Sequence, residues 1–402
     1  MTKTAFALRC RVCEEVAPPE PLDACRRCDG PTDVTYDWDR VARLATREAI
    51  AGGPASLWRY HPLLPAGARI EHGAGWTPLR RAERLSEALG IDLRLKLEDT
   101  NPTRSYKDRL AAVAVSAALD HGVTTLCCSS TGNLGDAVAA GASAAGLEAV
   151  VLAPVGGESA AVAARHPGAH VFAVDGTYDE CRRLELELGS LFPWGFVSGN
   201  LHPYASEGAK TISFEVAEQL GWRLPDAVVC PAASGTLFSK LAQGFTELVR
   251  AGLTHGPLPR LFAAQAQGSS PIADAFTDDR RISRVEADTT FASLAVGDPS
   301  YGDLAIGAAR ATGGRIVAVP AEEIRAHTEL LASTSDVTPD ASGGAALGAL
   351  VDAVRRGDIQ PGALVVLVVT GARPEPSDGD ESRATTVRPD ARDVLAALGL
   401  RS

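Results

Sequence analysis

The chain has 402 residues, and its 39 Lys and Arg against 50 Asp and Glu give a formal net charge of −11. An acidic chain whose longest basic run is a pair is unsuited to neutralising nucleic-acid phosphates or an anionic membrane surface, so no nucleic-acid or membrane partner is expected. Hydrophobic residues make up 45 % and charged residues 22 %, which is ordinary for a globular protein, and no apolar run approaches the ~20 residues of a membrane span. At roughly 150 residues per domain, the length predicts two or three domains.

Four cysteines open the chain: Cys10, Cys13, Cys25 and Cys28 form two C-x2-C pairs separated by 11 residues. Thiolates at this spacing can close a tetrahedron around zinc and leave no position open for a substrate. Residues 1–13 lack the apolar stretch of an export signal, so a cytoplasmic location is expected, and a reducing compartment favours a metal over disulfides. We therefore predict a structural zinc ribbon over residues 1–37 that ends in a strand; a disulfide pair or chance spacing is the alternative.

The next predicted elements are a helix over 38–51 and a Pro/Gly-rich arm over 52–78. From residue 79 onward, short apolar runs alternate with longer amphipathic ones. The alternation predicts helices over 105–122 and 132–146, and strands over 93–99, 124–130, 148–154, 170–176, 226–232, 260–268, 315–321 and 363–371. This pattern is typical of an α/β fold with parallel sheets covered on both faces. A polar segment over 375–389 predicts a linker and residues 392–400 a terminal helix.

The remaining cysteines, Cys127, Cys128, Cys181 and Cys230, lie in apolar or helical surroundings and are predicted to be small buried hydrophobic residues.

The most informative segment is NPTRSYKDR (101–109), which lies between a predicted strand and a predicted helix and places Lys107 in the first helical turn. The helix dipole and desolvation both lower the pKa of a lysine there, which gives a free amine able to form a Schiff base. An ordinary exposed lysine is the alternative for this residue taken alone. Only five of the 39 cations are lysines, and a lysine, unlike an arginine, can lose its proton. Lys96 and Lys210 lie in neighbouring motifs and are expected to support the site.

Three further segments lie at the ends of predicted strands. SSTGN (129–133) and AASGTL (232–237) are strand-to-helix turns of small residues, whose backbone N–H groups can hold an anion. Thr370 lies at the C-terminal end of the last apolar strand, at the edge of the sheet where ligands of open α/β folds gather. Each turn by itself is weak, because small residues also occur at such turns for packing alone.

Together these features resemble the fold-type II pyridoxal-phosphate enzymes and, within them, the threonine synthase family. The resemblance covers nearly the whole chain: the four cysteines and TYD (35–37), WRYHPLLP (58–65), GWTPL (75–79), KLEDTNPTRSYKDR (96–109), SSTGNLGDAVAA (129–140), EGAKTISFEVAEQLGWRLPD (207–226), QGFTEL (243–248) and VTGARP (369–374). It implies a fold like that of the tryptophan synthase β subunit, with residues 38–110 and 201–374 as a large cofactor-binding domain, 111–200 as a small α/β domain, and 375–402 as a linker and C-terminal helix. It also implies a homodimer that acts on a small amino-acid substrate.

The resemblance further implies the role of each site residue. Lys107 would hold pyridoxal 5'-phosphate as a Schiff base and later move protons. Asn133 would bond the phenolic oxygen, and the hydroxyl of Thr370 would meet the pyridine nitrogen and leave it unprotonated, which favours elimination and replacement. The cofactor phosphate would bind the loop formed by Ala232, Ala233, Ser234, Gly235 and Thr236. The substrate would contact Arg104, Ser105, Ser129, Ser130, Thr131, Gly132, Asn200 and His202.

The sequence departs from the family at the substrate-phosphate site. Arg104 replaces a glycine, His202 replaces an asparagine, and Ala205 replaces an arginine that helps to hold the substrate phosphate. One explanation is that Arg104 supplies the lost charge, since a guanidinium matches phosphate well. Another is that the substrate is not O-phosphohomoserine, the substrate of the reference reaction that yields threonine. The enzyme would then perform β-replacement or β-elimination on phosphoserine, O-acylserine or a related compound.

A third interpretation is a catalytically degenerate homologue that only binds. The intact Lys107, Asn133 and Thr370 argue against it.

Overall fold

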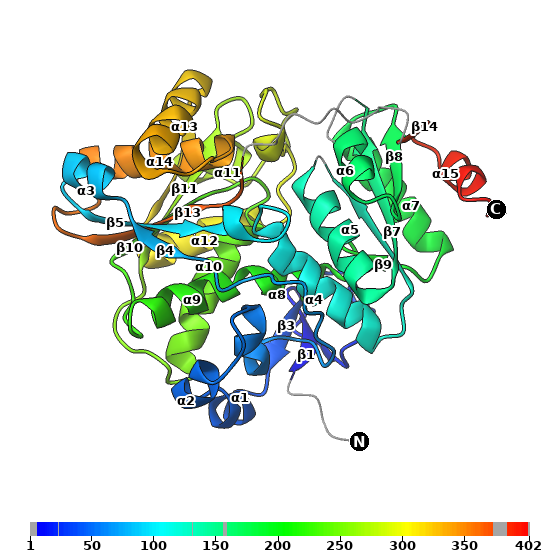
Figure 1. Cartoon of the computed structure of the whole chain (residues 1–402), viewed down its shortest axis with the longest axis horizontal. Helices are drawn as coiled ribbons and strands as arrows, with labels where there is room; N and C mark the ends of the chain where they lie inside the picture. Colours follow the sequence, from blue (N-terminus) through cyan, green and yellow to red (C-terminus); the bar gives the residue numbers. More distant parts are fainter. Residues whose placement is uncertain (1–5, 23, 131, 156–158, 373–383, 401–402) are drawn as a thin grey trace. The chain divides into compact units, whose positions relative to one another are not determined.

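The computed structural model describes residues 6–22, 24–130, 132–155, 159–372 and 384–400. The chain divides into two compact units (Figure 1). Unit 1 comprises residues 1–74, 107–208 and 375–402, and unit 2 comprises residues 75–106 and 209–374. The domain boundaries predicted from the sequence differ from these units chiefly in residues 38–74, and they stay a prediction.

Unit 1 begins with a small antiparallel sheet of order β2-β1-β3, formed by β1 (Phe6–Cys10), β2 (Val16–Ala17) and β3 (Thr32–Tyr36). Two short helices follow, α1 (Trp38–Leu44) and α2 (Arg47–Ala51), where one helix over 38–51 is expected. The break occurs because Thr46 adopts an extended conformation and its side chain caps α2 by accepting from the Ala49 amide. The Pro/Gly-rich arm also contains a short 3-10 helix, η1 (Leu57–Leu63).

The second sheet of unit 1 has the order β14-β8-β7-β6-β9 and is entirely parallel among the described residues. Its strands are β6 (Thr125–Ser129), β7 (Glu148–Pro154), β8 (His170–Val174), β9 (Gly195–Phe196) and β14 (Thr385–Val387). The helices of this part are α4 (Lys107–Asp120), α5 (Asn133–Ala145), α6 (Ser159–Arg165), α7 (Tyr178–Leu191), α8 (His202–Ala209) and α15 (Ala391–Ala397).

Strand β14 corrects part of the predicted linker over 375–389, of which residues 375–383 lie outside the described residues. Residues 385–387 form a strand because a parallel edge is open beside β8, and Val387 packs into the apolar core of this sheet. The terminal helix is confirmed as α15, whose Val394 and Leu395 join the same core.

Unit 2 contains a sheet of order β12-β11-β10-β13-β5-β4. Its strands are β4 (Leu79–Arg81), β5 (Asp92–Leu97), β10 (Ala227–Pro231), β11 (Arg260–Ala266), β12 (Arg315–Val319) and β13 (Leu364–Val369). The helices are α3 (Glu83–Leu89), η2 (Glu98–Thr100), α9 (Thr211–Gln219), α10 (Thr236–Arg250), α11 (Pro271–Thr277), η3 (Ala292–Leu294), α12 (Gly302–Thr312), α13 (Ala321–Ser335) and α14 (Ala341–Arg355). The predicted α/β class with parallel sheets is confirmed. The exceptions among the described residues are the small sheet β2-β1-β3 and the edge strand β4, which is antiparallel to β5.

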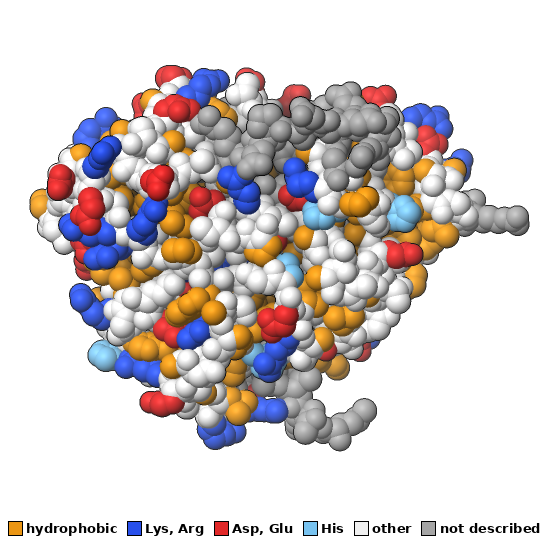
Figure 2. All heavy atoms as spheres, viewed as in Figure 1, with side chains coloured by type: hydrophobic (Ala, Val, Ile, Leu, Met, Phe, Trp, Pro, Cys, Tyr) orange, Lys and Arg blue, Asp and Glu red, His pale blue; other side chains and the backbone are white. Residues whose placement is uncertain are grey.

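Burial in the two units follows the sequence pattern. Cys127, Cys128, Cys181 and Cys230 are all buried, as predicted, and burial raises the pKa of each thiol. On the face shown in Figure 2, Lys and Arg side chains are interspersed with Asp and Glu. Within the part of the chain that the structure describes, no helix is both long and apolar enough to cross a membrane.

Candidate active site and cysteine cluster

Lys107 lies in the first turn of a helix, as predicted, and is the first residue of α4; the turn that precedes it belongs to unit 2. The backbone of this turn pairs with the residues that follow β13. The Tyr106 amide donates to the Thr370 carbonyl at 2.9 Å, and the Ala372 amide donates to the Arg104 carbonyl at 3.0 Å. Ser105 and Gly371 form an antiparallel bridge between these two bonds. The structure therefore brings Arg104, Ser105 and Thr370, three of the predicted site residues, to the carboxyl end of β13.

Arg104 adopts an unusual backbone conformation at this turn. Its φ is 60°, in the left-handed region that glycine enters freely and that costs an L-residue about 1–2 kcal/mol. Its guanidinium donates to Thr338 Oγ1 at 3.0 Å and remains partly exposed. Glycine is favoured at a position with this φ, and this chain forms the turn with an arginine.

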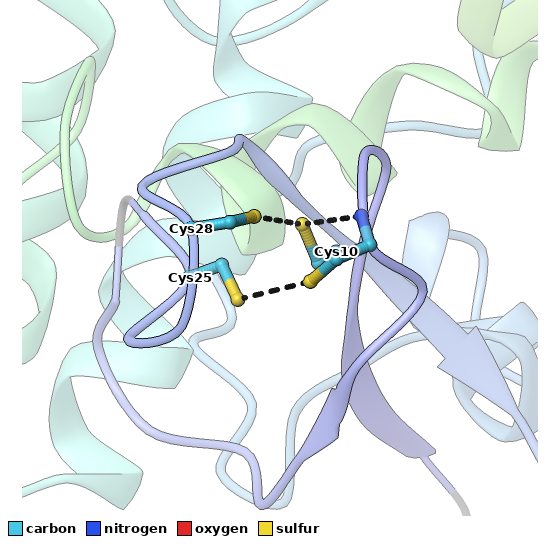
Figure 3. A group of neighbouring side chains, drawn as sticks. Cys10, Cys25 and Cys28 are labelled. Carbon is cyan, nitrogen blue, oxygen red and sulfur yellow. Dashed lines mark hydrogen bonds between the residues drawn. The ribbon is translucent and has the colours of Figure 1, made fainter.

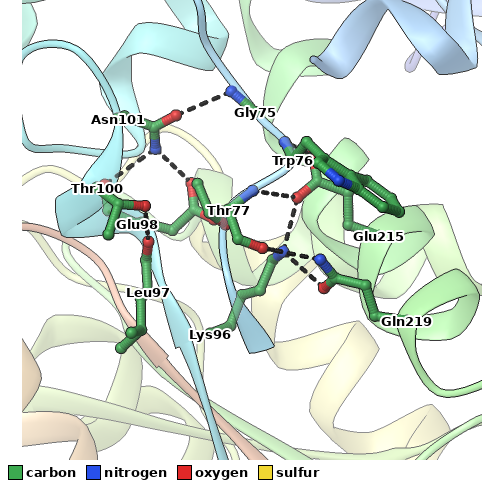
Figure 4. A network of polar contacts seen from close by, with 10 residues as sticks. All are labelled: Gly75, Trp76, Thr77, Lys96, Leu97, Glu98, Thr100, Asn101, Glu215 and Gln219. Atoms are coloured by element: carbon green, nitrogen blue, oxygen red, sulfur yellow. Dashed lines mark hydrogen bonds and ion pairs between the residues drawn. The ribbon is translucent and has the colours of Figure 1, made fainter. Parts of the chain in front are cut away.

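A buried polar network holds the start of the turn (Figure 4). Lys96 on β5 is fully buried, and its Nζ lies 2.6 Å from Glu215 Oε2 on α9. The same ammonium donates to the Thr77 carbonyl at 2.6 Å and to Gln219 Oε1 at 3.0 Å. Glu215 in turn accepts from the amides of Trp76 and Thr77. The ion pair therefore fixes residues 76–77 beside β5.

Glu98 continues the network toward the turn. Its carboxylate accepts from Thr77 Oγ1 at 2.7 Å and from Asn101 Nδ2 at 2.9 Å. The side-chain oxygen of Asn101 accepts from the Gly75 amide at 2.9 Å. Residues 98–101, which lead to Lys107 along the chain, are consequently tied to residues 75–77 by bonds of fixed direction.

Three of the lysines that the structure describes are buried. Lys96 and Lys210, which were expected to support the site, are both fully buried, and Lys210 Nζ lies 2.7 Å from Glu247 Oε2. Lys240 is also buried and donates to Gln243 Oε1 at 2.9 Å, although no role was predicted for it. The scarcity of lysine was the available signal, because a lysine retained in an arginine-rich chain is one whose place arginine does not fill.

The predicted cofactor-phosphate loop, residues 232–236, connects β10 to α10. Gly235 has a φ of 82°, and a Cβ added there would lie 2.7 Å from the Tyr301 carbonyl oxygen. Only glycine fits this position, because the backbone of the turn packs directly against the backbone of Tyr301. The first amides of an α-helix have no acceptor within the helix, and they favour an anion. Together with the small side chains of Ala232, Ala233 and Ser234, this loop fits a phosphate group.

The turn between β6 and α5 contains the predicted substrate-carboxylate residues. Ser130 Oγ accepts from the amides of Gly132 and Gly135, at 3.0 and 2.8 Å, and Asn133 begins α5. Thr131 lies outside the described residues. Both the amide and the hydroxyl of Ser129 donate to Glu185 on α7, and burial raises the pKa of this carboxyl above its ordinary value. Sequence reasoning missed Glu185, since nothing local connects it with Ser129.

Asn200 and His202 lie at the entry to α8. The Asn200 side chain accepts from the Phe196 amide at 2.8 Å and donates to the Trp194 carbonyl at 3.0 Å, so its amide group is engaged by the loop before it. A cavity within unit 1 is lined by residues that include Asn200 and Glu185. His202 is the first residue of α8, and Ala205 is fully buried in the same helix.

The four N-terminal cysteines gather at one end of the ribbon (Figure 3). The Sγ atoms of Cys10 and Cys28 are 3.5 Å apart, those of Cys13 and Cys25 are 3.7 Å apart, and all four lie within 4.8 Å of one another. A disulfide needs about 2.05 Å. Tetrahedral zinc–thiolate bonds of about 2.3 Å place the sulfur atoms about 3.8 Å apart. The spacing therefore fits four thiolates around one metal ion and does not fit two disulfides.

Comparisons with known proteins define the class of this protein. Residues 70–371 match the family described as "Pyridoxal-phosphate dependent enzyme", and the chain belongs to that family. Its relatives point to one branch of it. Threonine synthase of Methanosarcina acetivorans is 33 % identical over 374 residues, which cover 91 % of each chain. Threonine synthase of Mycobacterium tuberculosis H37Rv is 32 % identical over 356 residues, which cover 86 % of this chain and 96 % of the relative.

Solved structures agree on the fold. Processed threonine deaminase isoform 2 from Solanum lycopersicum matches 76 % of this chain and 85 % of its own with a TM-score of 0.63 at 21 % identity. Maize serine racemase matches 83 % of this chain and 96 % of its own with a TM-score of 0.65 at 19 % identity. The fold-type II class and the resemblance to threonine synthases are thus confirmed, and the protein is a pyridoxal-phosphate-dependent lyase.

Proposed function

We propose that this enzyme eliminates or replaces an activated oxygen substituent on an amino acid, with the conversion of O-phosphohomoserine to threonine as the reference reaction. The observation that carries the proposal is the 33 % identity to a threonine synthase over 91 % of both chains. The position of Lys107 at the start of α4, directly after a turn bonded to Thr370, supports it. A homodimer and a cytoplasmic location stay predictions.

The resemblance supplies the proposed roles of the site residues. Lys107 Nζ holds the cofactor covalently and, once released, takes and returns a proton at the substrate's α carbon. The bound pyridoxal phosphate supplies the electron sink that stabilises the carbanion. The amides around Gly235 would hold its phosphate, Asn133 would donate to its phenolic oxygen, and Thr370 would meet its ring nitrogen, as the resemblance implies. We assign the substrate carboxylate to the turn between β6 and α5, as the resemblance implies. Both donors of Ser129 contact Glu185.

Arg104 is the proposed anion ligand of the substrate. Its partly exposed guanidinium is kept at a backbone cost, which supports a selected role for the side chain. A phosphorylated substrate fits this assignment, because the guanidinium can donate two parallel hydrogen bonds to phosphate oxygens. Ser105, whose hydroxyl donates to the Thr370 carbonyl at 3.4 Å, holds the turn beneath it.

A second candidate is β-replacement or β-elimination on phosphoserine or an O-acylserine. The observation that favours it is Ala205, which is fully buried in α8 where threonine synthases carry a phosphate-binding arginine. Such a reaction loses the leaving group from Cβ, one carbon earlier than the reference reaction.

The experiment that separates the two candidates is a substrate panel. Phosphate release from O-phosphohomoserine and O-phosphoserine is compared with acetate release from O-acetylserine and O-acetylhomoserine. We expect a phosphorylated substrate to be preferred, and Arg104→Gln to raise its KM about tenfold while it leaves the KM of an acetylated substrate nearly unchanged. Preference for an acetylated substrate contradicts the role of Arg104 and favours an O-acylserine reaction.

Covalent attachment is tested separately. Borohydride reduction of the cofactor-loaded protein is expected to fix the cofactor to Lys107, located by peptide mass spectrometry, and Lys107→Ala is expected to abolish the label. Lys240→Ala is the control, since Lys240 is a buried lysine on α10 that is paired with Gln243. A wild-type protein with no label overturns the proposed chemistry. A labelled protein that turns over no amino acid on the panel indicates the degenerate binding homologue.

We also propose one structural Zn²⁺ bound by Cys10, Cys13, Cys25 and Cys28. Four thiolates with no open position suit a structural ion. Metal analysis of reduced protein is expected to find one zinc per chain, lost in Cys25→Ser and retained in Cys181→Ser, whose cysteine lies on α7 outside the ribbon. Reduced wild-type protein without metal contradicts the site.

A further inference from the structure

Two motifs that the proposed chemistry does not use meet in the structure. Tyr36, in the TYD sequence that ends the ribbon, is the last residue of β3, and Glu207 lies in the EGAKT sequence of α8. Tyr36 Oη donates to Glu207 Oε2 at 2.8 Å across 171 residues of sequence. Both side chains are buried, and Glu207 is fully so. A buried carboxylate is costly unless it is hydrogen-bonded, so this bond is a strong determinant of where α8 lies against the ribbon.

A second contact joins the same helix to the ribbon segment. Tyr204 is fully buried, and its hydroxyl donates to the Glu20 carbonyl at 2.9 Å. Its ring meets the ring of Phe6 on β1 edge to face, with centroids 6.4 Å apart. Tyr204 and Glu207 are three residues apart and therefore share one side of the helix. The N-terminal segment therefore contacts α8 at two residues, Tyr204 and Glu207.

The helix α8 also contacts α4, which begins with Lys107. A Cβ added to Gly208 would lie 2.1 Å from the Arg109 carbonyl oxygen and 2.5 Å from the Arg109 carbonyl carbon. The two backbones are consequently in direct contact only two residues after Lys107. Beyond the other end of α4, the ring of His121 lies 5.7 Å from the ring of Tyr204. Helix α8 therefore contacts the ribbon segment, the first turn of α4, and His121, the residue that follows α4.

We propose that the ribbon segment positions the catalytic lysine, with Tyr36 and Glu207 as the positioning residues. Backbone contact at Gly208 leaves no layer of side chains to absorb a displacement, so a shift of α8 against the ribbon moves the first turn of α4 and with it Lys107. A small misplacement of a reacting group can lower a rate strongly, because catalysis depends on its orientation. This inference rests on the proposed role of Lys107 and adds that the ribbon is part of the catalytic scaffold.

The test is Tyr36→Phe in the cofactor-loaded enzyme, which removes one hydroxyl and keeps the ring. We expect kcat to fall about tenfold with KM within twofold, because the substrate-binding groups are untouched. We also expect a shifted midpoint in the pH titration of the bound cofactor's visible absorbance, which reports on the surroundings of the Lys107 nitrogen. Glu207→Gln keeps an acceptor oxygen for Tyr36 and is expected to retain kcat within about twofold. Tyr178→Phe, on α7, is the control for the same chemical change.

The outcomes separate positioning from stability. If Tyr36→Phe lowers the urea midpoint of unfolding but leaves kcat and the absorbance titration at wild-type values, the ribbon is only a structural support and the inference fails. It fails as well if Glu207→Gln loses as much kcat as Tyr36→Phe. Failure of the proposed chemistry is distinguishable, because the wild-type protein would then show no borohydride-trapped cofactor at all.

Discussion

The turn before Lys107 and the helix that begins with it are anchored by different kinds of interaction. In unit 2, residues 98–101 are held by a buried polar network centred on the Lys96–Glu215 ion pair. In unit 1, α4 is held by close packing: Gly208 contacts the Arg109 backbone, and the buried face of α4 is rich in alanine. A buried ion pair and its hydrogen bonds fix the orientation of the chain, but losing one partner leaves a costly unpaired charge. Close packing involves no charge, but it leaves no room for an added atom.

The largest effect is expected in the buried polar network of unit 2. Lys96→Met leaves the fully buried Glu215 carboxylate without its ammonium partner, and removing one member of a buried pair costs about 3–5 kcal/mol. The free energy of unfolding, measured with urea, is expected to fall by that amount.

The double variant Lys96→Met/Glu215→Leu sharpens this result. Replacing both charges with apolar side chains of similar volume is often neutral or stabilising, so most of the loss is expected to be recovered. A single variant that loses less than about 1 kcal/mol, the size of an exposed pair, would show that the network does not anchor the turn.

Much of the fold was accessible from the sequence because its signals are local. The alternation of apolar strands and amphipathic helices predicted the α/β class, and the strand over 148–154 coincides with β7. The elements that were missed depend on distant partners. The segment TTV of β14 is short and mostly exposed, so only the open edge of β8 makes it a strand. The break between α1 and α2 depends on one capping residue, Thr46, inside an otherwise helical pattern.

The site divides in the same way. Lys107, Thr370 and the loop around Gly235 could be predicted because each lies at a strand end with a recognisable local sequence. The residues that hold the site in place could not be predicted. Nothing near Ser129 in the sequence indicates Glu185, and nothing near Tyr36 indicates Glu207, because a hydrogen bond across 171 residues leaves no periodic pattern. The left-handed conformation at Arg104 was indicated only by the glycine that the resemblance implies at this position, since an arginine by itself gives no sign of it.

The close packing on the unit 1 side is tested by a matched pair of helical glycines. Gly208→Ala places a methyl group 2.1 Å from the Arg109 carbonyl oxygen, which only a backbone shift can relieve, and a loss of about 1–3 kcal/mol is expected. Gly307 lies inside α12 with no atom within 4 Å of an added Cβ, so Gly307→Ala is expected to gain about 0.5–1 kcal/mol. Urea unfolding of both variants measures the difference. Equal effects would mean that α8 and α4 adjust freely, and the contrast between the two sides would disappear.

The smallest effect is expected at Arg104, whose own backbone is strained. Arg104→Gly relieves a φ of 60° but loses the bond to Thr338, so a net gain of at most about 1 kcal/mol is expected. Asp336→Gly is the control, since Asp336 has a φ of 51° and aspartate tolerates this region better, which makes a smaller gain the expectation. The informative measurement combines urea unfolding with KM for the phosphorylated substrates. A more stable Arg104→Gly enzyme with a raised KM would show that strain is retained because the guanidinium binds the substrate's anion. A more stable enzyme with unchanged KM would show that Arg104 arose by drift. Residues other than Arg104 and Ala205 would then have to bind the substrate phosphate.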